Sequence, residues 1–398
     1  MKSKRKLYIW LACLAGIFVL FYTQWDKWFG DLPEPAFELS SSPQRLFIVP
    51  GEDGMRDRSF SWVNGTELPF QFTLVRDSVE VVYQPSHSTQ VTGGGTTHSY
   101  NLRLKGLTDG EYQCYITAKD VPDTLRGAFS IQSQCTDLDF LLIGDIQDGK
   151  WSEDPAFFKE LHDRYADVDA VLFVGDMIER PHDQYWSMFS TSLAPFSKHI
   201  PFIPVPGNHE YLLGGLSSLG KRYIYAYPMP TNGPDNKKGR TYYIDYPLVR
   251  IIGLDTNMLV TNYFSTKSWL KNALDMPAHS PFTIVMGHHG VHSVRKGRSN
   301  PLMKYGIDPI LREYNVDLLL QGHDHAYSRN GSSNSSRPIY ITQSTSMKCY
   351  AVGDPDDHDA SFSGERMYSQ IHITSDTLYF YSFKQDHTLF DSFKLPRN

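Results

Sequence analysis

Five apolar runs between residues 139 and 325 each end close to a glycine that is followed directly by polar residues. They read DFLLIGD (139–145), DAVLFVGD (169–176), PFIPVPGNHE (201–210), PFTIVMGHH (281–289) and VDLLLQGHDH (316–325). Continuous apolar runs of this length are typical of strands that are buried on both faces of a sheet in α/β proteins. Because helix-like stretches lie between the runs, residues 136–398 are predicted to form an α/β domain.

The polar residues after these runs form a predicted set of metal ligands. Ligands of α/β sheets bind beyond the carboxyl ends of the strands, so motifs at five such ends should meet in one crevice. Each glycine is expected to let the backbone turn sharply as it leaves its strand. Carboxylate, amide and imidazole groups together suit ions such as Zn, Mn or Fe. The predicted ligands are Asp145, Asp176, Asn208, His288, His323 and His325.

The His-x-His pair indicates two ions rather than one. In an extended backbone His323 and His325 would point to the same side of the chain. They could then bind two ions about 3.5–4 Å apart, as in two-metal sites, with Asp176 as the bridging carboxylate. Taken singly, each motif has an ordinary explanation, since Gly-Asp after a strand is usually a turn and Asn208 alone would be a turn former. The ordered combination of all five in one domain favours the metal site.

Residues 45–135 follow a different pattern, in which short β-like runs are separated by turn residues. Alternation is clear where Tyr112, Cys114 and Ile116 interleave with Gln113, Tyr115 and Thr117. Strands spaced roughly 8–12 residues apart, without helical periodicity, predict a β-sandwich. The preceding residues 31–44 are rich in Pro and Ser and are predicted to be a linker.

The N-terminal residues 1–30 are predicted to be a signal anchor or a signal peptide. Four basic residues among the first six precede an apolar run from Leu7 to Tyr22. This order is typical of export signals, although a bilayer core needs roughly 17–25 apolar residues, so the run is marginal for spanning. An uncleaved membrane anchor is favoured and a cleaved signal is the alternative. In either case the rest of the chain is expected to be exported.

Cysteine usage and charge exclude some classes of function. Cys13, Cys114, Cys135 and Cys349 form no C-x-x-C pair, which argues against a thiolate zinc site. In an oxidising compartment Cys114 and Cys135 could form a disulfide or stay free, and their spacing does not decide between the two. A net charge of -6 gives no electrostatic footprint for nucleic acid.

The ordered motifs resemble those of the calcineurin-like metallophosphoesterase superfamily, and their details resemble its purple acid phosphatase branch. The similar stretches are GHDHAYSR (322–329), YYIDYPLVRIIGLDTN (242–257), STKSWLKNAL (265–274) and LRLKGLTDGEYQCYI (102–116). The resemblance implies a four-layer α/β/β/α catalytic domain preceded by a small fibronectin/Ig-like β-sandwich and the N-terminal hydrophobic anchor.

The resemblance also implies how the ligands are shared between two divalent or trivalent ions, with Fe, Zn and Mn all open. Of the adjacent histidines, His288 matches the family ligand better than His289. Gln147 stands where the superfamily often has His, so it is either a ligand or a group that hydrogen-bonds a ligand. Glu179 stands where purple enzymes have Tyr, so a purple iron site is not expected. The implied sets are Asp145, Asp176 and His325 for the first ion, and Asp176, Asn208, His288 and His323 for the second.

The expected activity is hydrolysis of a phosphate ester, most readily a monoester, by in-line attack of a metal-activated water. His209 is expected to protonate the leaving oxygen or to hold the phosphate, and Glu210 could orient it. His292 is a further candidate for contact with substrate, with a surface-loop histidine as the alternative. Hydrolysis of diesters or lipid headgroups is the close rival, and a non-catalytic surface binding protein is a hypothesis of another class.

Overall fold

The computed structural model describes residues 32–147, 154–215, 218–257, 259–277, 280–331 and 337–397, with isolated positions 10, 15, 16 and 19. The predicted N-terminal anchor lies outside the described residues apart from those four positions. Within the described part of the chain, no helix is both long and apolar enough to cross a membrane.

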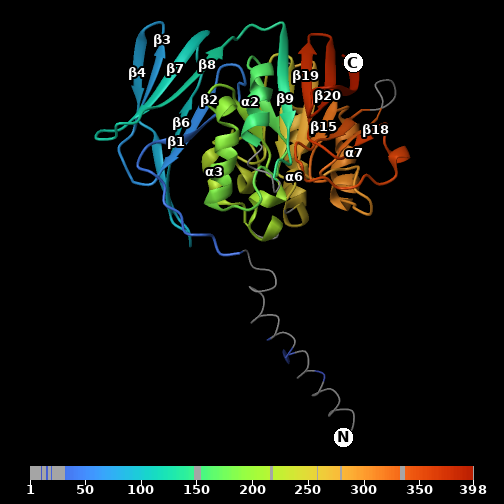
Figure 1. Ribbon diagram of the computed structural model, residues 1–398. Coiled ribbons are helices and arrows are strands. Elements are labelled where there is room, and N and C mark those ends of the chain that lie inside the picture. Colours follow the sequence, from blue (N-terminus) through green and yellow to red (C-terminus); the bar gives the residue numbers. More distant parts are fainter. Residues whose placement is uncertain are drawn as a thin grey trace.

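The N-terminal region forms two antiparallel four-stranded sheets (blue and teal in Figure 1). One sheet has the order β1 (Gln44–Pro50), β2 (Arg58–Asn64), β6 (Thr96–Leu104), β5 (Ser86–Val91). The other has the order β4 (Val79–Tyr83), β3 (Gln71–Arg76), β7 (Gly110–Thr117), β8 (Leu125–Ile131). Apolar side chains from both sheets form one core, in which the rings of Trp62 and Tyr100 stack 5.6 Å apart. The two sheets therefore make a β-sandwich, as the alternating pattern predicts.

The remainder of the chain contains two larger sheets. The first has the order β11 (Phe202–Pro204), β10 (Ala170–Phe173), β9 (Asp137–Ile143), β19 (Met367–Thr374), β20 (Thr377–Lys384), β21 (Leu389–Pro396). The second has the order β12 (Tyr242–Asp245), β13 (Val249–Leu254), β14 (Phe282–Gly287), β15 (Leu318–Gln321), β17 (Ile339–Thr342), β16 (Tyr327–Asn330), β18 (Ala360–Phe362). Strands β9 to β11 are parallel, and so are β13, β14, β15 and β17.

Helices and the two sheets share two apolar cores. The larger core joins side chains of both sheets with those of α2 (Asp154–Arg164), α3 (Asp183–Ser192), α4 (Ala194–Ser197) and α5 (Lys221–Ala226). The smaller core lies between the seven-stranded sheet and α6 (Leu259–Asp275), η4 (Met303–Ile307) and α7 (Asp308–Glu313). Short turns of 3-10 helix are η1 (Asn208–Glu210), η2 (Leu212–Gly215), η3 (Asp235–Lys237) and η5 (Pro355–Asp357). The mixed α/β class is confirmed by this arrangement.

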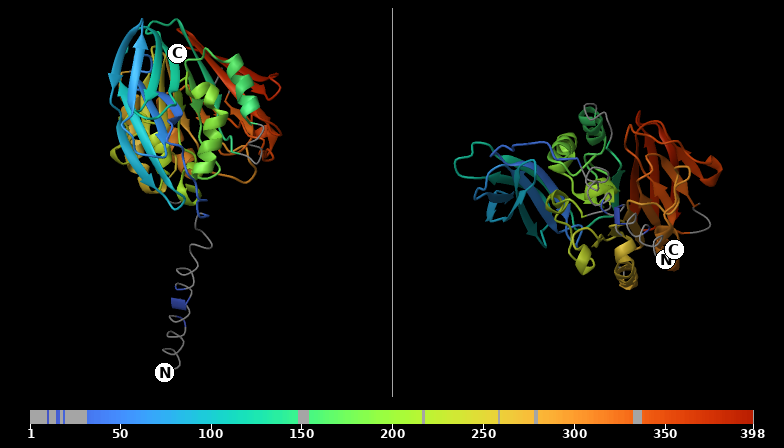
Figure 2. Two further views of the ribbon diagram at one scale, coloured as in Figure 1. Left: turned by 60° about the vertical axis from the view of Figure 1, so that its left-hand side comes forward. Right: turned by 90° about the horizontal axis from the view of Figure 1, so that it is seen from below.

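Strand β1 attaches the sandwich to the rest of the molecule. Its side chains alternate, so that Leu46 and Ile48 lie in the sandwich core whereas Phe47 and Val49 lie in the larger core. The Phe47 ring contacts the ring of Tyr227 at 5.2 Å. Figure 2 shows the consequence, since the sandwich and the C-terminal strands (red) lie at opposite ends with green helices between them.

The predicted linker is packed against the same boundary. Glu34 accepts a hydrogen bond from the backbone N–H of Asp183 and forms an ion pair with Arg222 at 2.9 Å. The segment before β1 is therefore docked rather than free. Among the described cysteines, Cys114, Cys135 and Cys349 are unpaired, so the free-thiol alternative is the one the structure contains.

Candidate metal centre

Five strand ends bring the predicted ligands together, and they come from two sheets. Strands β9, β10 and β11 of the six-stranded sheet end just before Asp145, Asp176 and Asn208. Strands β14 and β15 of the seven-stranded sheet end just before His288 and His323. Both sheets contribute side chains to the larger core, and the carboxyl ends of these parallel strands meet at one place. A single sheet rim would not bring these groups as close.

Lone-pair atoms converge on His288. Its Nδ1 donates to the carbonyl of Val174 at 2.8 Å, so Nε2 faces the other groups. That nitrogen lies 3.1 Å from His323 Nδ1, 3.2 Å from Asp176 Oδ2 and 3.3 Å from Asn208 Oδ1. Asp176, His288 and His323 therefore offer ligand atoms within 4.8 Å of one another. Four acceptor atoms gathered this closely need a cation among them.

The other half of the cluster contains Asp145, Gln147 and His325. Gln147 Nε2 lies 3.0 Å from Asp176 Oδ2 and 3.2 Å from His325 Nε2. Three buried atoms have no hydrogen-bond partner among the described residues, namely Asp145 Oδ1, Gln147 Oε1 and His325 Nδ1. Buried polar atoms are rarely left unpaired, so these atoms fit coordination of a metal ion. Turning the Gln147 amide by half a turn would place its oxygen where it could bind the same ion.

The pKa values of the clustered residues also favour a positive charge between them. Burial lowers the pKa of His288, but the charge and hydrogen bond of Asp176 outweigh this effect and raise it to about 9. The negative charge of Asp176 therefore favours a positive charge at this position. Burial raises the pKa of Asp145 to about 7, against the charge of His288 and with that of Asp176. Burial and then Lys348 lower the pKa of His325 to about 3, so its lone pair is free for a metal.

The backbone turns at the ligands themselves rather than at the glycines. Asp145 and Asp176 have φ of 49° and 53°, and His323 and His325 have φ of 78° and 47°. Non-glycine residues in this region are strained by about 1–3 kcal/mol each, and such strain clusters at functional sites. The predicted extended backbone of the His-x-His pair is therefore wrong. Each histidine instead reaches a different half of the cluster from a left-handed turn.

Most of the glycines at the strand ends lie where neighbouring atoms come too close to leave room for a side chain. Of the five, Gly175 has a positive φ, whereas the predicted turning role is wrong for the others. A Cβ at Gly207 would lie 2.1 Å from Asp176 Oδ1, and one at Gly322 would lie 2.8 Å from Asp145 Oδ1. The missing side chains leave room for the two carboxylates.

The Gly207→Ala variant tests this packing. The added methyl group must displace the Asp176 carboxylate, and a misplacement of about 1 Å in a catalytic group can cost about 100-fold in rate. We therefore expect kcat/KM for hydrolysis of a phosphate ester to fall about 100-fold, with a parallel loss of bound metal. Gly93→Ala is the matched control, because a Cβ at Gly93 meets nothing within 4 Å. Equal activity of the two variants would refute the packing argument.

Glu210 has a role that the sequence did not reveal. Its buried carboxylate accepts hydrogen bonds from the backbone N–H groups of Gly207 (2.6 Å), Asp176 (3.0 Å), Met177 (2.7 Å) and Ile178 (3.3 Å). It thus ties the loop after β10 to the loop after β11. This clamp between the two loops replaces the expectation that Glu210 orients His209. It joins Glu210 to residues about 30 positions earlier in the chain.

Asn257 holds the same loop from the other sheet. Its Nδ2 donates to the carbonyls of Pro206 and Gly207 at 3.0 and 3.3 Å. The LDTN stretch that contains Asn257 was part of the family resemblance, and this was the available signal for the residue. Asn257 therefore positions the ligand loop without being a ligand itself.

The structure shows where the remaining candidate histidines lie relative to the cluster. His209 lies at the edge of the cluster, with Nε2 4.0 Å from Asp176 Oδ2 and a side chain 24% exposed. His289 Nδ1 lies 2.9 Å from Thr256 Oγ1 and its ring packs against that of His323 at 4.4 Å, whereas Nε2 of His288 faces Asp176 and Asn208. That His292 contacts substrate stays a prediction. Its ring packs on Tyr340 at 4.6 Å, on the helix-covered side of the seven-stranded sheet.

Comparison with known proteins finds one matching family and several similar proteins. Residues 138–327 match the family described as calcineurin-like phosphoesterase. Human acid phosphatase type 7 is 26% identical over 189 residues, which cover 40% of this chain and 40% of that protein. Purple acid phosphatase 22 of Arabidopsis thaliana is 22% identical over 326 residues, which cover 76% and 71%. The structure of GAP50, described as the anchor in the inner membrane complex of Plasmodium, aligns with a TM-score of 0.49 and 17% identity over 66% of this chain and 90% of that chain.

Two mixed sheets whose strand ends gather carboxylate, amide and imidazole groups define a metallophosphoesterase-type domain. Residues 138–327, just under half of the chain, are similar to the calcineurin-like phosphoesterase family. The similar proteins include an acid phosphatase and a purple acid phosphatase, in line with the resemblance of the motifs. The match spans about two fifths of the human relative.

Proposed function

We propose that this chain is a metal-dependent phosphatase that hydrolyses phosphate esters, with monoesters preferred. The observation that carries the proposal is the convergence of ligand atoms around His288 Nε2, together with the unpaired buried atoms in the other half of the cluster. The relatives named as acid phosphatases support the choice of monoesters.

Two ions fit the ligand set. The first would be held by Asp145, Gln147, Asp176 and His325, and the second by Asp176, Asn208, His288 and His323. Bound there, the ions supply a water of lowered pKa and neutralise charge that develops on the phosphoryl oxygens. The donors are oxygen and imidazole nitrogen, which suit Zn, Mn or Fe. Glu179 at the position of the purple-type tyrosine supports a site without the purple colour.

His209 is the proposed proton donor to the leaving oxygen. Its Nδ1 lies 2.7 Å from the carbonyl of Glu179, which can only accept, so Nδ1 carries a hydrogen. The atom that exchanges a proton is therefore Nε2, and it lies on the side of the ring that faces Asp176. The backbone N–H of His209 donates to Asp176 Oδ1 at 2.9 Å, which keeps the residue next to the centre.

The His209→Gln variant tests this role. General acid catalysis contributes about 100- to 10,000-fold, so kcat should fall by about 100-fold or more for an alkyl phosphate, whose leaving group needs a proton. For p-nitrophenyl phosphate the loss should be much smaller, because that leaving group departs as an anion. His292→Gln is the control and should leave both rates unchanged. Equal losses for the two substrates would contradict the acid role.

Chelation tests the proposal as a whole. Purified full-length protein should hydrolyse p-nitrophenyl phosphate, lose the activity in a chelator, and regain it when Zn²⁺ or Mn²⁺ is returned. A parallel panel of phosphodiesters and lipid headgroup esters should react more slowly. A protein that binds the metal but turns over no member of the panel would favour the non-catalytic binding protein. Activity that persists after complete removal of metal would refute the proposal.

The proposal includes export of the chain. Its support is the basic and apolar order of residues 1–30, with membrane attachment through the apolar run as the favoured form. Fractionation of cells that express the full chain, followed by protease protection of the catalytic domain, would test which side of the membrane carries it.

A further inference from the structure

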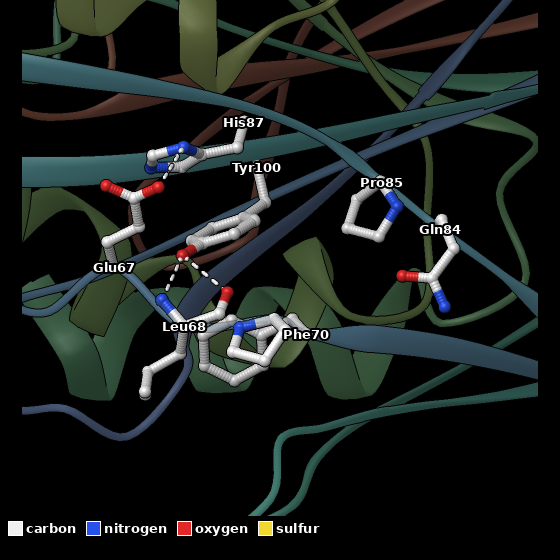
Figure 3. A pocket seen from close by; sticks show the side chains of 8 residues that line it. Glu67, Leu68, Phe70, Gln84, Pro85, His87 and Tyr100 are labelled. Carbon is white, nitrogen blue, oxygen red and sulfur yellow. Dashed lines mark hydrogen bonds and ion pairs between the residues drawn. The ribbon is translucent and has the colours of Figure 1, made fainter.

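A second cluster of possible metal ligands lies on the β-sandwich, away from the catalytic centre. His87 lies on β5, His98 lies on β6, and Glu67 lies between β2 and β3. In the β5–β6 ladder His87 pairs with Tyr100 and Thr89 pairs with His98. Residues two apart on a strand share a face, so both histidines point to the same side of the sheet. Figure 3 shows Glu67 and His87 facing each other beside Tyr100.

The ligand atoms of this cluster are at distances that suit one ion. His87 Nε2 lies 3.1 Å from His98 Nδ1, and Glu67 Oε1 lies 3.6 Å from His87 Nδ1. One ligand atom from each residue can be chosen so that all three lie within 4.8 Å of one another. Zinc bonds to imidazole and carboxylate are about 2.0–2.2 Å long, so ligand atoms around one ion are roughly 3–3.5 Å apart. Because Nε2 of His87 faces His98 and Nδ1 of His87 faces Glu67, one of these two partners must move toward the other nitrogen when a single ion binds.

We propose that Glu67, His87 and His98 bind one divalent transition-metal ion of the Zn²⁺ class, separately from the catalytic centre. Two neutral imidazoles and one carboxylate are the donor set that such ions select. Thr89 Oγ1 lies 3.2 Å from His98 Nδ1 and adds a further oxygen beside the ion.

The surroundings hold the carboxylate close to the histidines. The hydroxyl of Tyr100 accepts from the N–H of Leu68 and donates to the carbonyl of Leu68, each at 2.9 Å. These two bonds fix the backbone of Leu68, the neighbour of Glu67, to Tyr100. The ring of Tyr100 in turn lies 4.8 Å from that of His87. A cavity of about 590 Å³ adjoins Glu67 and His87, so solvent can supply the remaining ligand.

The ion would connect the two sheets of the sandwich. His87 and His98 belong to the β1–β2–β6–β5 sheet, whereas Glu67 lies in the segment that crosses to the other sheet at β3. The ligand atoms come together only in the folded sandwich. Binding is therefore expected to stabilise the folded state and to raise the midpoint of thermal unfolding.

Metal counting on the full-length protein tests the proposal. Chelator-stripped protein is titrated with Zn²⁺ and bound zinc is measured by mass spectrometry and calorimetry. His87→Gln should bind one ion fewer per chain than the natural sequence and should keep its phosphatase activity. Glu67→Gln should bind that ion about tenfold more weakly or worse, because loss of even a group that only orients a ligand costs about 10- to 100-fold.

Two further variants separate this site from the others. The Asp176→Asn variant, which damages the catalytic centre, should still bind one zinc ion that is lost on adding His87→Gln, whether or not the proposed phosphatase activity is correct. His372→Gln is the matched control, because His372 also lies beside carboxylates, with Nδ1 3.2 Å from Asp139. Zinc counts that are equal in His87→Gln and the natural sequence would overturn the proposal. They would show that the two histidines only hydrogen-bond each other. Loss of the ion in His372→Gln rather than His87→Gln would also overturn it.

Discussion

Replacing Asp176 by Asn is expected to lower kcat/KM for a phosphate monoester by about 1,000-fold or more. Asp176 is the residue that contacts both halves of the cluster, since its Oδ2 lies 3.0 Å from Gln147 Nε2 and 3.2 Å from His288 Nε2. Asparagine keeps the shape of the side chain but removes the negative charge that both ions would share. Loss of one electrostatic group at a transition state costs about 100- to 1,000-fold, and a bridging ligand serves two ions. The effect corresponds to about 4 kcal/mol in the barrier.

The measurement is steady-state kinetics at saturating metal, together with a count of bound ions. The Asp163→Asn variant is the control, because it makes the same chemical change on the exposed face of α2. Its activity should match that of the natural sequence. If Asp176→Asn retained full activity and full metal content, the shared-carboxylate centre would be excluded.

Replacing Glu210 by Leu is expected to destabilise the fold and to inactivate the site together. The substitution leaves four backbone N–H groups without the carboxylate that accepts from them. Each buried donor left unpaired costs about 1–3 kcal/mol, so the total loss in the free energy of unfolding should be about 4 kcal/mol or more. For a domain of this size, that corresponds to a fall in Tm of roughly 8–16 °C.

Two comparisons give this prediction its control. Glu38→Leu changes an exposed carboxylate and should move Tm by less than about 2 °C, as expected for a surface substitution. Glu210→Gln should be intermediate, since an amide oxygen can accept some of the bonds while its NH₂ group opposes the others. If Glu210 acts as a clamp, Glu210→Leu should lose both stability and metal affinity. A variant that lost activity at unchanged Tm would point to direct chemistry by Glu210 instead of the clamp.

The side chains of the centre could be named in advance because each ligand follows the end of its strand. In the GD motifs at Asp145 and Asp176, and in the GHDH motif, the strand and the ligand are neighbours along the chain. Buried parallel strands are easily recognised by their apolar runs, and their carboxyl ends lie on one side of a sheet. The choice of residues therefore depended on local sequence only.

The contacts at the centre that the sequence does not reveal join distant parts of the chain. His292 is four residues from His288, yet its ring lies against Tyr340 on the other side of the seven-stranded sheet. Glu210 is adjacent to His209, yet it bonds backbone groups of the loop at Asp176. The room that Gly207 leaves is occupied by Asp176. Neighbourhood along the chain could not supply any of these partners.

Residue order alone is enough to predict an α/β domain, a preceding β-sandwich and the identity of the predicted ligands, because strand periodicity and strand-end motifs are local patterns. The packing of the two sheets against each other determines which residues from distant parts of the chain come into contact. It placed β14 and β15 opposite β9 to β11, turned β1 into a strand buried on both faces, and brought His87, His98 and Glu67 to one corner of the sandwich. Such contacts join residues tens to hundreds of positions apart, and their energies come from burial and hydrogen bonding that no single segment contains.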